Sequence, residues 1–583
     1  MSRYSILKRT NMFIAAVFIL LTFTFSYSLA EWPPEGLQVT PTDALRYQRY
    51  KVAPDSAGGA YVAWFNTTGY PSYCLIQRID RDGNLLWDEP GISPTDTDSL
   101  GGIDFSEILP APGGGVYVVY TGFVPGESAN MYAQNLSREG ERLFGPRGVQ
   151  LTNDEYSQYL LSEQDAKNMV VPDGEGGLIA AYWISNYPPN QRSIHAARVD
   201  SSGEVLWTGG VAHDYGRQGG ASHAQAVSDN AGGIIIVWSG DEDAPDGEGI
   251  YAQRLNADGE EMWWWPWVNK IFAQRPPFFA SLASWDPGEF VFAVEVGRTL
   301  EVDLCFGHVN SAGGPSLGLN GQTIFEDAEH FDIEPIAASD GYVYIPFEEE
   351  IYGDLYKRLY KLDETGTHYF GEDGIDFDTC TIYWTIGFEM IADSERVTLV
   401  YADYVRMGYD IPTAQAISSS GDFLWGDCPF RIVEESEEIR NTDLIETCVV
   451  GGDTIFVAFS DHHTVWAIML YPDGSSPAFP NEIEEFPNSS LPDDYSIIGA
   501  FPNPFNPEIN VRYNINQPGL YRFKVFNLNG QMIYRNDIKL EETGQYDWNW
   551  NGSGQASGIY FISLNRVDIE QVNNKIVKVV LLK

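Results

Sequence analysis

Two stretches of the chain about 119 residues apart, MYAQNLSREGERLF from Met131 and IYAQRLNADGEEMW from Ile250, are nearly the same sequence. They belong to a set of eight related turns, each a first residue, two further residues and a glycine: Asp80–Gly83, Ser137–Gly140, Asp200–Gly203, Asn256–Gly259, Asn310–Gly313, Asp363–Gly366, Ser418–Gly421 and Tyr471–Gly474. Their glycines are spaced 57, 63, 56, 54, 53, 55 and 53 residues apart. A glycine that can take a positive φ at the fourth position is typical of a short β-hairpin loop. The chain is therefore expected to repeat one hairpin-containing unit eight times.

A second marker stands about 25 residues before each turn, a near-continuous apolar run such as GGAYVAW at Gly58 or GGIIIVW at Gly232. Runs rich in β-branched and aromatic residues suit strands that are covered on both faces. Repeats of 50 to 60 residues with several short strands and almost no helical periodicity indicate the blades of a β-propeller rather than a solenoid. Eight turns predict an all-β, eight-bladed propeller. Seven blades, with one degenerate copy outside the ring, is the alternative.

The N-terminus carries a strand that belongs to the end of a repeat. GLQVT at residues 36–40 matches GVQLT at residues 148–152, which follows the hairpin turn of the second repeat. The last repeat, in turn, ends soon after Gly474. We therefore expect Leu37 to Thr40 to complete the eighth blade and close the ring.

After the repeats the sequence changes character twice. Residues 479–496 are rich in proline and acidic residues and are expected to form a linker between the propeller, residues 31–478, and a separate domain, residues 497–583. This tail holds nine Lys and Arg against seven Asp and Glu, so the acidity of the chain belongs to the segments before it. Five short strand patterns over about 85 residues predict a small, Ig-like antiparallel β-sandwich.

The tail also carries ordered motifs: FPNPFNP, YRFKVFNLNGQMIY, YDWNWNG, SGIYFISL and a terminal KIVKVVLLK. In that order they resemble the C-terminal sorting domain of type IX secretion substrates, with a departure at Phe501, where the family often has tyrosine. The matching positions are Phe501, Pro502, Asn503, Pro504, Phe505, Asn506, Pro507, Gly530, Gly558 and Lys583. The resemblance implies export by the outer-membrane secretion machinery to the cell surface or the medium. A module that only caps or spaces the propeller is the alternative.

Residues 36–478 resemble, for their part, tandem repeats of bacterial exported proteins in which GGxxVAW strands alternate with IYAQRLDxxGxxLW hairpins. That resemblance implies a propeller but no single activity, because one fold carries many functions.

The first 30 residues have the pattern of a signal peptide. Arg3, Lys8 and Arg9 precede an apolar run from about Met12 to Phe25, and Ser28-Leu29-Ala30 is a small-x-small cleavage pattern. The apolar run is short for an uncleaved anchor, and no later segment is long and apolar enough to span a membrane. We expect the mature chain to begin near Glu31 and to have no membrane span.

Charge excludes two classes of partner. The chain holds 82 Asp and Glu against 35 Lys and Arg, a formal charge of −47, which would repel nucleic acid and anionic lipid. Its five cysteines are too few for a disulfide framework in a chain of 583 residues, although one or two bridges fit the count.

One segment suggests a metal site. Asp241, Asp243 and Asp246 precede Gly247, and closely spaced carboxylates beside a glycine turn can bind calcium through oxygen ligands. The segment departs from the EF-hand pattern, and a solvated loop in the fourth blade explains it without an ion. No other cofactor is indicated.

Three further motifs are better explained by structure than by chemistry. Ser316 lies in a GPSLG sequence but lacks the strand and helix that a nucleophile elbow requires. His462 and His463 have no third well-spaced ligand. The cluster Trp263, Trp264, Trp265 and Trp267 could stack on a sugar, but strand alternation would bury some of these rings whatever the function. No catalytic residue is assigned.

The sequence thus leads to three functional hypotheses. The first is a non-enzymatic secreted or cell-surface binding protein that contacts a glycan, a protein or a cation. The second is a secreted hydrolase acting on polysaccharide or peptide, with carboxylates grouped at the channel mouth. The third is a structural or adhesion protein without a discrete pocket. Facing acids with raised pKa values in one central pocket would favour the enzyme.

Overall fold

The computed structural model describes residues 32–583 except for 42–49, 67–72, 89, 97–102, 123–128, 153–157, 160–165, 168, 187–190, 214–220, 241–246, 264–268, 274–279, 299–300, 329, 334–335, 352–353, 379, 381–384, 407–408, 427, 435–441, 443, 461–463, 478–494, 504, 528–531, 541 and 567–574. The described chain is all-β apart from one 3-10 turn, η1 (Pro112–Gly114). It forms two compact units, Met1–Ile483 and Glu484–Lys583.

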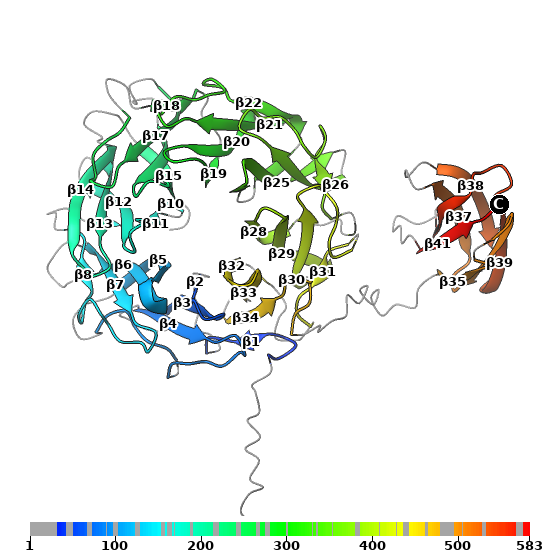
Figure 1. The fold of residues 1–583 in the computed structure, drawn as a ribbon, viewed down its shortest axis with the longest axis horizontal. Helices are drawn as coiled ribbons and strands as arrows, with labels where there is room; N and C mark the ends of the chain where they lie inside the picture. Colours follow the sequence, from blue (N-terminus) through cyan, green and yellow to red (C-terminus); the bar gives the residue numbers. More distant parts are fainter. Residues whose placement is uncertain are drawn as a thin grey trace, which may run out of the picture. The chain divides into compact units, whose positions relative to one another are not determined.

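In the described part of the first unit, eight sheets follow one another around a ring, which gives a propeller-like fold (Figure 1). We number them in chain order. Sheet 1 contains β2 (Tyr50–Pro54), β3 (Ala60–Asn66) and β4 (Tyr73–Ile79), and sheet 2 contains β5 (Ile103–Ala111), β6 (Gly115–Gly122), β7 (Asn130–Leu136) and β8 (Val149–Gln150). Sheet 3 contains β9 (Gln158–Tyr159), β11 (Val170–Pro172), β12 (Leu178–Asn186), β13 (Gln191–Val199) and β14 (Val205–His213). Sheet 4 contains β10 (Ala166–Lys167), β15 (Ala221–Ser228), β16 (Ile234–Gly240), β17 (Gly249–Leu255) and β18 (Asn269–Phe272).

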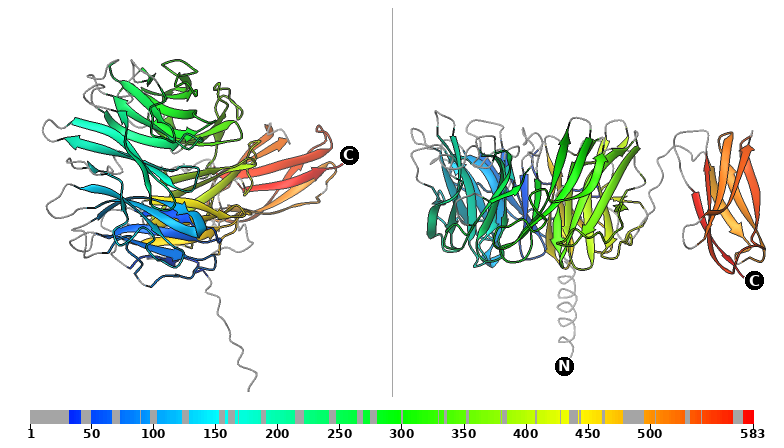
Figure 2. Two further views of the ribbon diagram at one scale, coloured as in Figure 1. Left: turned by 60° about the vertical axis from the view of Figure 1, so that its left-hand side comes forward. Right: turned by 90° about the horizontal axis from the view of Figure 1, so that it is seen from above.

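Sheets 5 to 8 continue the ring. Sheet 5 contains β19 (Ala280–Ser284), β20 (Phe290–Arg298), β21 (Glu301–Val309) and β22 (Gln322–Ala328). Sheet 6 contains β23 (His330–Ile333), β24 (Ala337–Ser339), β25 (Tyr342–Ile351), β26 (Asp354–Leu362) and β27 (Ile375–Asp376). Sheet 7 contains β28 (Thr385–Ala392), β29 (Arg396–Arg406), β30 (Tyr409–Ser418) and β31 (Phe430–Arg431), and sheet 8 contains β32 (Leu444–Gly451), β33 (Thr454–Ser460), β34 (Val465–Leu470) and β1 (Leu37–Gln38). Figure 2 shows that the long strands run along the ring axis.

The first strand of the chain lies in the last sheet. β1 pairs antiparallel with β34, Leu37 opposite Ala467 and Gln38 opposite Trp466. The pairing continues past β1, because Val39 donates its amide to the carbonyl of Val465 at 2.8 Å and Thr40 Oγ1 accepts the amide of Val465 at 2.9 Å. The two ends of the repeat region are thus joined within one sheet.

The hydrophobic core is divided among the gaps between neighbouring sheets. Trp64 and Ile79 of sheet 1, for example, share one buried cluster with Phe456 and Met469 of sheet 8. The second strand of sheet 1 is buried on both faces, from Ala60 to Trp64. Each sheet therefore needs both of its neighbours to remove its apolar side chains from water.

The eight turns predicted from the sequence are confirmed. The glycine that ends each turn has a φ between +78° and +94°, a region that L side chains rarely adopt. In the first turn, Asp80 Oδ1 accepts the amides of Asp82 and Asn84, which fixes the loop locally.

The tail is a separate unit of two facing sheets. One has the strand order β35 (Tyr495–Phe501), β36 (Glu508–Ile515) and β39 (Gly544–Asn551). The other has the order β38 (Met532–Leu540), β37 (Gly519–Asn527), β40 (Gly558–Arg566) and β41 (Lys575–Leu581). One cluster of buried aromatic and aliphatic residues from both sheets forms the core of this unit.

Candidate functional site

Tryptophans join neighbouring sheets through the glycine turns. Trp87 of sheet 1 donates its indole N–H to the carbonyl of Arg138 in the turn of sheet 2, at 3.2 Å. The equivalent bond from Trp207 of sheet 3 reaches Ala257 in sheet 4 at 2.7 Å, with the indole lying against Gly259, where an added Cβ would come within 2.8 Å of the ring. These tryptophans are fixed by the fold and are not free to contact a ligand.

The joints on the two sides of sheet 8 are built in the same way. Trp425 of sheet 7 donates to the carbonyl of Pro472 in sheet 8 at 3.3 Å, and Trp32, before β1, donates to the carbonyl of Arg81 in sheet 1 at 3.0 Å. Trp32 lies against Gly83 and is 7% exposed. The N-terminal segment therefore supplies both the outer strand and the joint tryptophan of sheet 8.

Buried ion pairs reinforce several sheets. In sheet 3, Asp173 Oδ1 accepts the amides of Glu175 and Gly177, and Oδ2 accepts Nε of Arg198 at 2.9 Å. Arg198 also donates to the carbonyl of Ala257, the same carbonyl that accepts Trp207. Burial alone would lower the pKa of Arg198, but its hydrogen bonds to Asp173 and Glu175 outweigh burial and raise it.

The same pair recurs as Asp55 with Arg78 and as Asp229 with Arg254. In sheet 2, Ala111 and Asn135 stand at the two positions, so both charges are absent together. A lone buried charge would be costly, which explains the joint change. The pattern assigns these charges to folding rather than to ligand binding.

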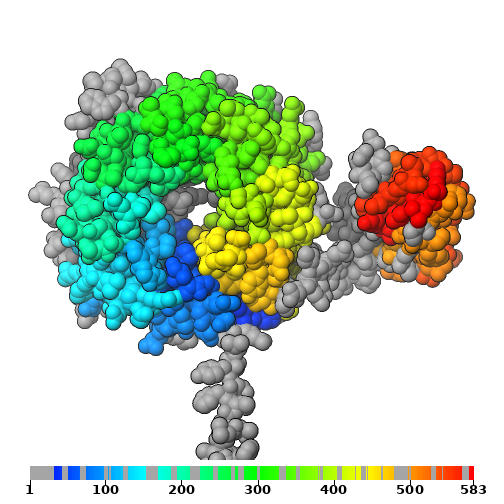
Figure 3. Space-filling model, in the orientation of Figure 1, coloured from blue at the N-terminus to red at the C-terminus, as the bar shows by residue number. Residues whose placement is uncertain are grey.

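A different set of charges is carried by the first strands of four sheets, which lie innermost in the ring (Figure 1) around the central opening of the space-filling view (Figure 3). Lys51 on β2 forms an ion pair with Glu446 on β32, with 2.6 Å between Nζ and Oε1. Glu107 on β5 and Glu389 on β28 lie near enough to act on the same ammonium. Burial opposes the charge of Lys51, but the three carboxylates outweigh it and raise the pKa of Lys51.

These four residues occupy one position of the repeat. Each lies on the first strand of its sheet, opposite a small or aliphatic residue of the second strand that an aromatic residue follows directly. The pairs are Lys51 with Ala63, Glu107 with Val119, Glu389 with Val400, and Glu446 with Ala458. In sheets 4 and 5 the same position holds the uncharged Gln225 and Ser281. The inner strands of the four consecutive sheets 7, 8, 1 and 2 therefore carry three carboxylates and one ammonium at this position.

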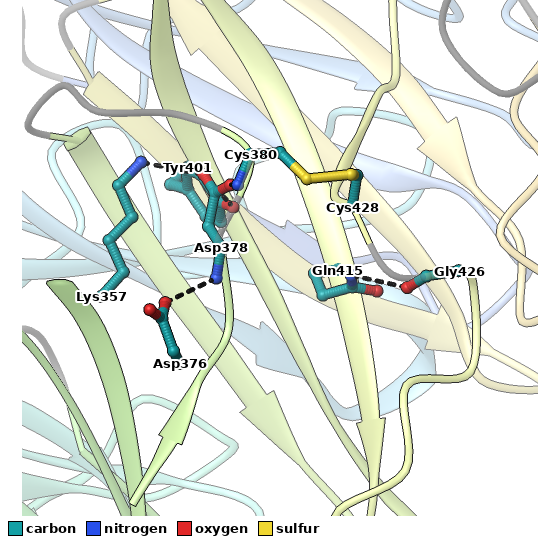
Figure 4. The surroundings of a disulfide bond; sticks show 8 residues. All are labelled: Lys357, Asp376, Asp378, Cys380, Tyr401, Gln415, Gly426 and Cys428. Atoms are coloured by element: carbon teal, nitrogen blue, oxygen red, sulfur yellow. Dashed lines mark hydrogen bonds and ion pairs between the residues drawn. A yellow bond between two sulfur atoms is a disulfide. The ribbon is translucent and has the colours of Figure 1, made fainter. Parts of the chain in front are cut away.

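A buried charge network lies between sheets 6 and 7 (Figure 4). Lys357 Nζ is 2.9 Å from Oδ2 of Asp378 and 3.4 Å from Oδ1 of Asp403, and its side chain is 1% exposed. Tyr401 donates its hydroxyl to Asp378 at 3.3 Å and lies under the ammonium, 5.3 Å from Nζ to the ring centroid. Burial lowers the tendency of Lys357 to carry charge, but the carboxylates of Asp378 and Asp403 outweigh it and raise its pKa.

This network was not found from the sequence, although a signal was present. The run FEEE at 347–350 places three consecutive carboxylates directly after the apolar residues of the same strand. Alternation sends Glu348 toward sheet 7, where its carboxylate accepts the amide of Thr385 at 3.0 Å, and Glu349 toward the opposite face, where it pairs with Arg358 at 2.8 Å. Burial raises the pKa of Glu349 despite that pairing.

A disulfide lies beside the network. Cys380, whose amide bonds Asp378 Oδ1 at 3.0 Å, is linked to Cys428 at a sequence separation of 48. Cys74, Cys305 and Cys448 are not part of a disulfide. The bridge ties the connection that carries Asp378 to the outer part of sheet 7.

We predict that replacing both bridge cysteines, Cys380→Ser with Cys428→Ser, lowers the free energy of unfolding by about 2–4 kcal/mol. The reason is that the unfolded chain, once the bridge is gone, regains the conformational entropy of a loop of this length. Denaturant unfolding of the variant and the parent measures the difference. Cys74→Ser with Cys448→Ser removes two thiols without opening a loop, and a loss from the bridge variant no larger than from this control would contradict the prediction.

The calcium prediction at Asp241, Asp243 and Asp246 lies outside the described residues, as do Trp264, Trp265, Trp267, His462 and His463. Within the described ranges, no group of three or more His, Cys, Asp or Glu side chains is placed to hold a metal ion. Ser316 is exposed, directly follows an isolated bridge between Val309 and Pro315, and is followed by turn structure rather than a helix. Trp263 is 3% exposed and donates its indole N–H to the carbonyl of Ser311, so it joins neighbouring sheets as Trp87 and Trp207 do.

The sorting-motif residues gather at the C-terminal strand. Asn503 and Phe505 both hydrogen-bond β41, and the Phe505 ring is buried against Trp550 with 5.5 Å between centroids. Gly558 begins β40 opposite Leu581, and Lys583 bonds the turn before it. Phe501 is 43% exposed, with the Arg512 guanidinium 4.9 Å from its ring centroid. Pro504 and Gly530 lie outside the described residues.

Comparison with known families agrees with this placement. Residues 499–579 match the secretion system C-terminal sorting domain. A comparison with curated proteins found no match. Among solved structures, an ulvan lyase of polysaccharide lyase family 25 is similar at 11% identity and a TM-score of 0.38, over 64% of this chain and 92% of that chain. The β-propeller domain of the Trilobed protease from Pyrococcus furiosus is similar at 8% identity and a TM-score of 0.32, over 62% and 91%.

The protein is thus an exported one: its tail is a type IX sorting domain, which directs the chain to the cell surface or the medium. The partner that follows from this tail is the secretion machinery. In the described part of the chain, no helix has the length and apolar character needed to cross a membrane.

Proposed function

We propose that the chain is a secreted or cell-surface binding protein: a leader over residues 1–30, a closed eight-bladed β-propeller over 31–478 that contacts its ligand at the central channel, a linker over 479–496, and a sandwich over 497–583 that serves export. The observation that carries the proposal is the charged side of the channel. Four consecutive sheets carry Lys51, Glu107, Glu389 and Glu446 at one position of their innermost strands.

The charge of this surface favours a ligand that presents a cationic group. Three carboxylates outnumber one ammonium there, and the whole chain carries a formal charge of −47. Partly enclosed charges are screened less by salt than exposed ones. A basic protein segment or an amino-sugar polymer has the complementary chemistry, whereas an anionic polysaccharide would be repelled.

Two carboxyl groups with a raised pKa in the described part of the chain do not form a facing catalytic pair. Burial raises the pKa of Glu349 and of Asp376, and both lie beside Arg358 within sheet 6. General acid catalysis needs such a group in contact with substrate. These two groups therefore give the hydrolase no support.

The proposal predicts retention without chemistry on an array that pairs cationic with anionic polysaccharides and basic with acidic peptides, probed with the full mature chain with and without calcium. We expect retention of the cationic members and no released sugar or cleaved peptide. Glu107→Gln with Glu389→Gln should weaken retention by about thirty-fold or more, since each charge-assisted contact contributes roughly 1–2 kcal/mol.

The matched control is Glu139→Gln with Glu364→Gln, which removes two exposed carboxylates from the turns and should leave retention unchanged. Equal weakening by both pairs would assign retention to net charge alone and contradict a channel site. Released product would replace the binding function with the hydrolase, and no retention of any member would reject both.

A further inference from the structure

The tail contains one strand edge that the chain itself covers. β41 is the last strand of its sheet, paired on one side only with β40. An edge strand leaves a row of backbone N–H and C=O groups open to pairing with another chain. Here the groups at Lys578, Val580 and Leu582 are occupied by the FPNPFNP segment, more than 70 residues earlier in the sequence.

Asn503 takes the place of a neighbouring strand at this edge. Its side-chain Nδ2 donates to the carbonyl of Lys578 at 3.0 Å, and its Oδ1 accepts the amide of Val580 at 2.8 Å. A carboxamide offers one donor group and one acceptor, as a peptide unit does, whereas a carboxylate offers acceptors alone. Two residues later, Phe505 donates its amide to Val580 and accepts the amide of Leu582, at 2.8 and 3.0 Å.

The end of the chain is held at the same place. Lys583 donates its amide to Ser557 Oγ at 3.0 Å and its Nζ to the carbonyl of Ser553 at 2.7 Å. The side chains of Asn503, Lys578, Leu582 and Lys583 are exposed, with Leu582 53% exposed. The beginning and the end of the matched domain thus form one surface, with two lysines beside an exposed apolar side chain.

We infer that the secretion machinery recognises this composite edge, formed by Asn503, Phe505 and residues 578–583, and that Asn503 is the positioning residue that assembles it. The partner it fits is a protein surface with an apolar contact for Leu582 and carboxylates for Lys578 and Lys583. The export signal is then a folded surface rather than a linear motif. This inference concerns the tail alone and does not rest on the ligand of the propeller.

The test follows the full-length chain in a host with a type IX system and measures the fraction that reaches the surface and medium against the fraction kept in the periplasm. Asn503→Ala removes both side-chain hydrogen bonds and should lower the exported fraction by about tenfold. Asn503→Asp keeps the acceptor for Val580 and should give an intermediate loss. Asn549→Ala removes an exposed asparagine of β39 that donates to Asn510 Oδ1, and should export as the parent does.

Hydrogen exchange on the purified chain separates assembly of the edge from folding of the tail. With Asn503→Ala we expect faster exchange at Val580 and Leu582 and unchanged exchange in the core strand β37. Parent-like export of that variant, despite faster exchange at Val580, would overturn the inference. Should the variant leave the whole tail unfolded, Leu582→Ser with Lys578→Ser decides, because both side chains are exposed: a lower exported fraction supports the composite edge, and an unchanged one overturns it.

Discussion

Lys357→Met is expected to lower the free energy of unfolding of the repeat region by about 3–5 kcal/mol, because it removes one partner of the buried ion pairs with Asp378 and Asp403. Methionine nearly matches the lysine side chain in length, so the loss reports charge rather than volume. Denaturant unfolding followed by tryptophan fluorescence measures it.

Two further variants show whether the loss of stability comes from the buried charge. Arg81→Met removes a cation that is 76% exposed and should change stability by no more than roughly 0.5 kcal/mol. The triple variant Lys357→Met, Asp378→Asn, Asp403→Asn removes the carboxylates as well and should recover much of the loss, since a neutral buried set avoids the desolvation of unpaired charges. If the triple variant were less stable than Lys357→Met, the cost would lie in packing and not in charge.

Trp32→Ala is expected to lower the free energy of unfolding by a similar amount, about 3–5 kcal/mol, the usual range for truncating a buried tryptophan. The indole bonds the carbonyl of Arg81 and covers Gly83, so its loss weakens the one joint where the ring is closed by the N-terminal segment. We expect the variant to be cut by protease between residues 33 and 40 while the other sheets stay folded.

Trp425→Ala is the matched control for closure. It removes the equivalent indole from the joint between sheets 7 and 8, which the continuous chain also connects. Both variants should lose comparable stability, but only Trp32→Ala should expose the N-terminal segment. Equal protection of residues 33–40 in the two variants would show that β1 is held without Trp32.

The repeating features were accessible from the sequence because their chemistry is local. A polar residue and a glycine three positions later specify each turn without help from the rest of the chain. The match between residues 36–40 and 148–152 likewise pointed to the last sheet, where β1 pairs with β34. In the same way, ordered tail motifs were enough to recognise the sorting domain.

The charge pairs were not accessible, because their partners meet only after the sheets have formed. Asp173 and Arg198 are 25 residues apart, and the only signal was the simultaneous change to Ala111 and Asn135 in the second repeat. Glu348 and Glu349 are buried on opposite faces of one strand, and their partners come from other strands. The channel position of Lys51 and Glu446 depends on pairing across 395 residues.

The shared carbonyls at the joints bear on how such a chain can change by recombination. Ala257 accepts both Arg198 and Trp207 of the preceding sheet, and Pro472 accepts both Arg396 and Trp425. The module that must be inherited intact is therefore the seam between two sheets rather than a sheet. Any crossover between residues 207 and 257 would separate the donors Arg198 and Trp207 from their acceptor and combine donors and turns that had not evolved together. Divergence of the later repeats, seam by seam, is the pattern that this constraint predicts.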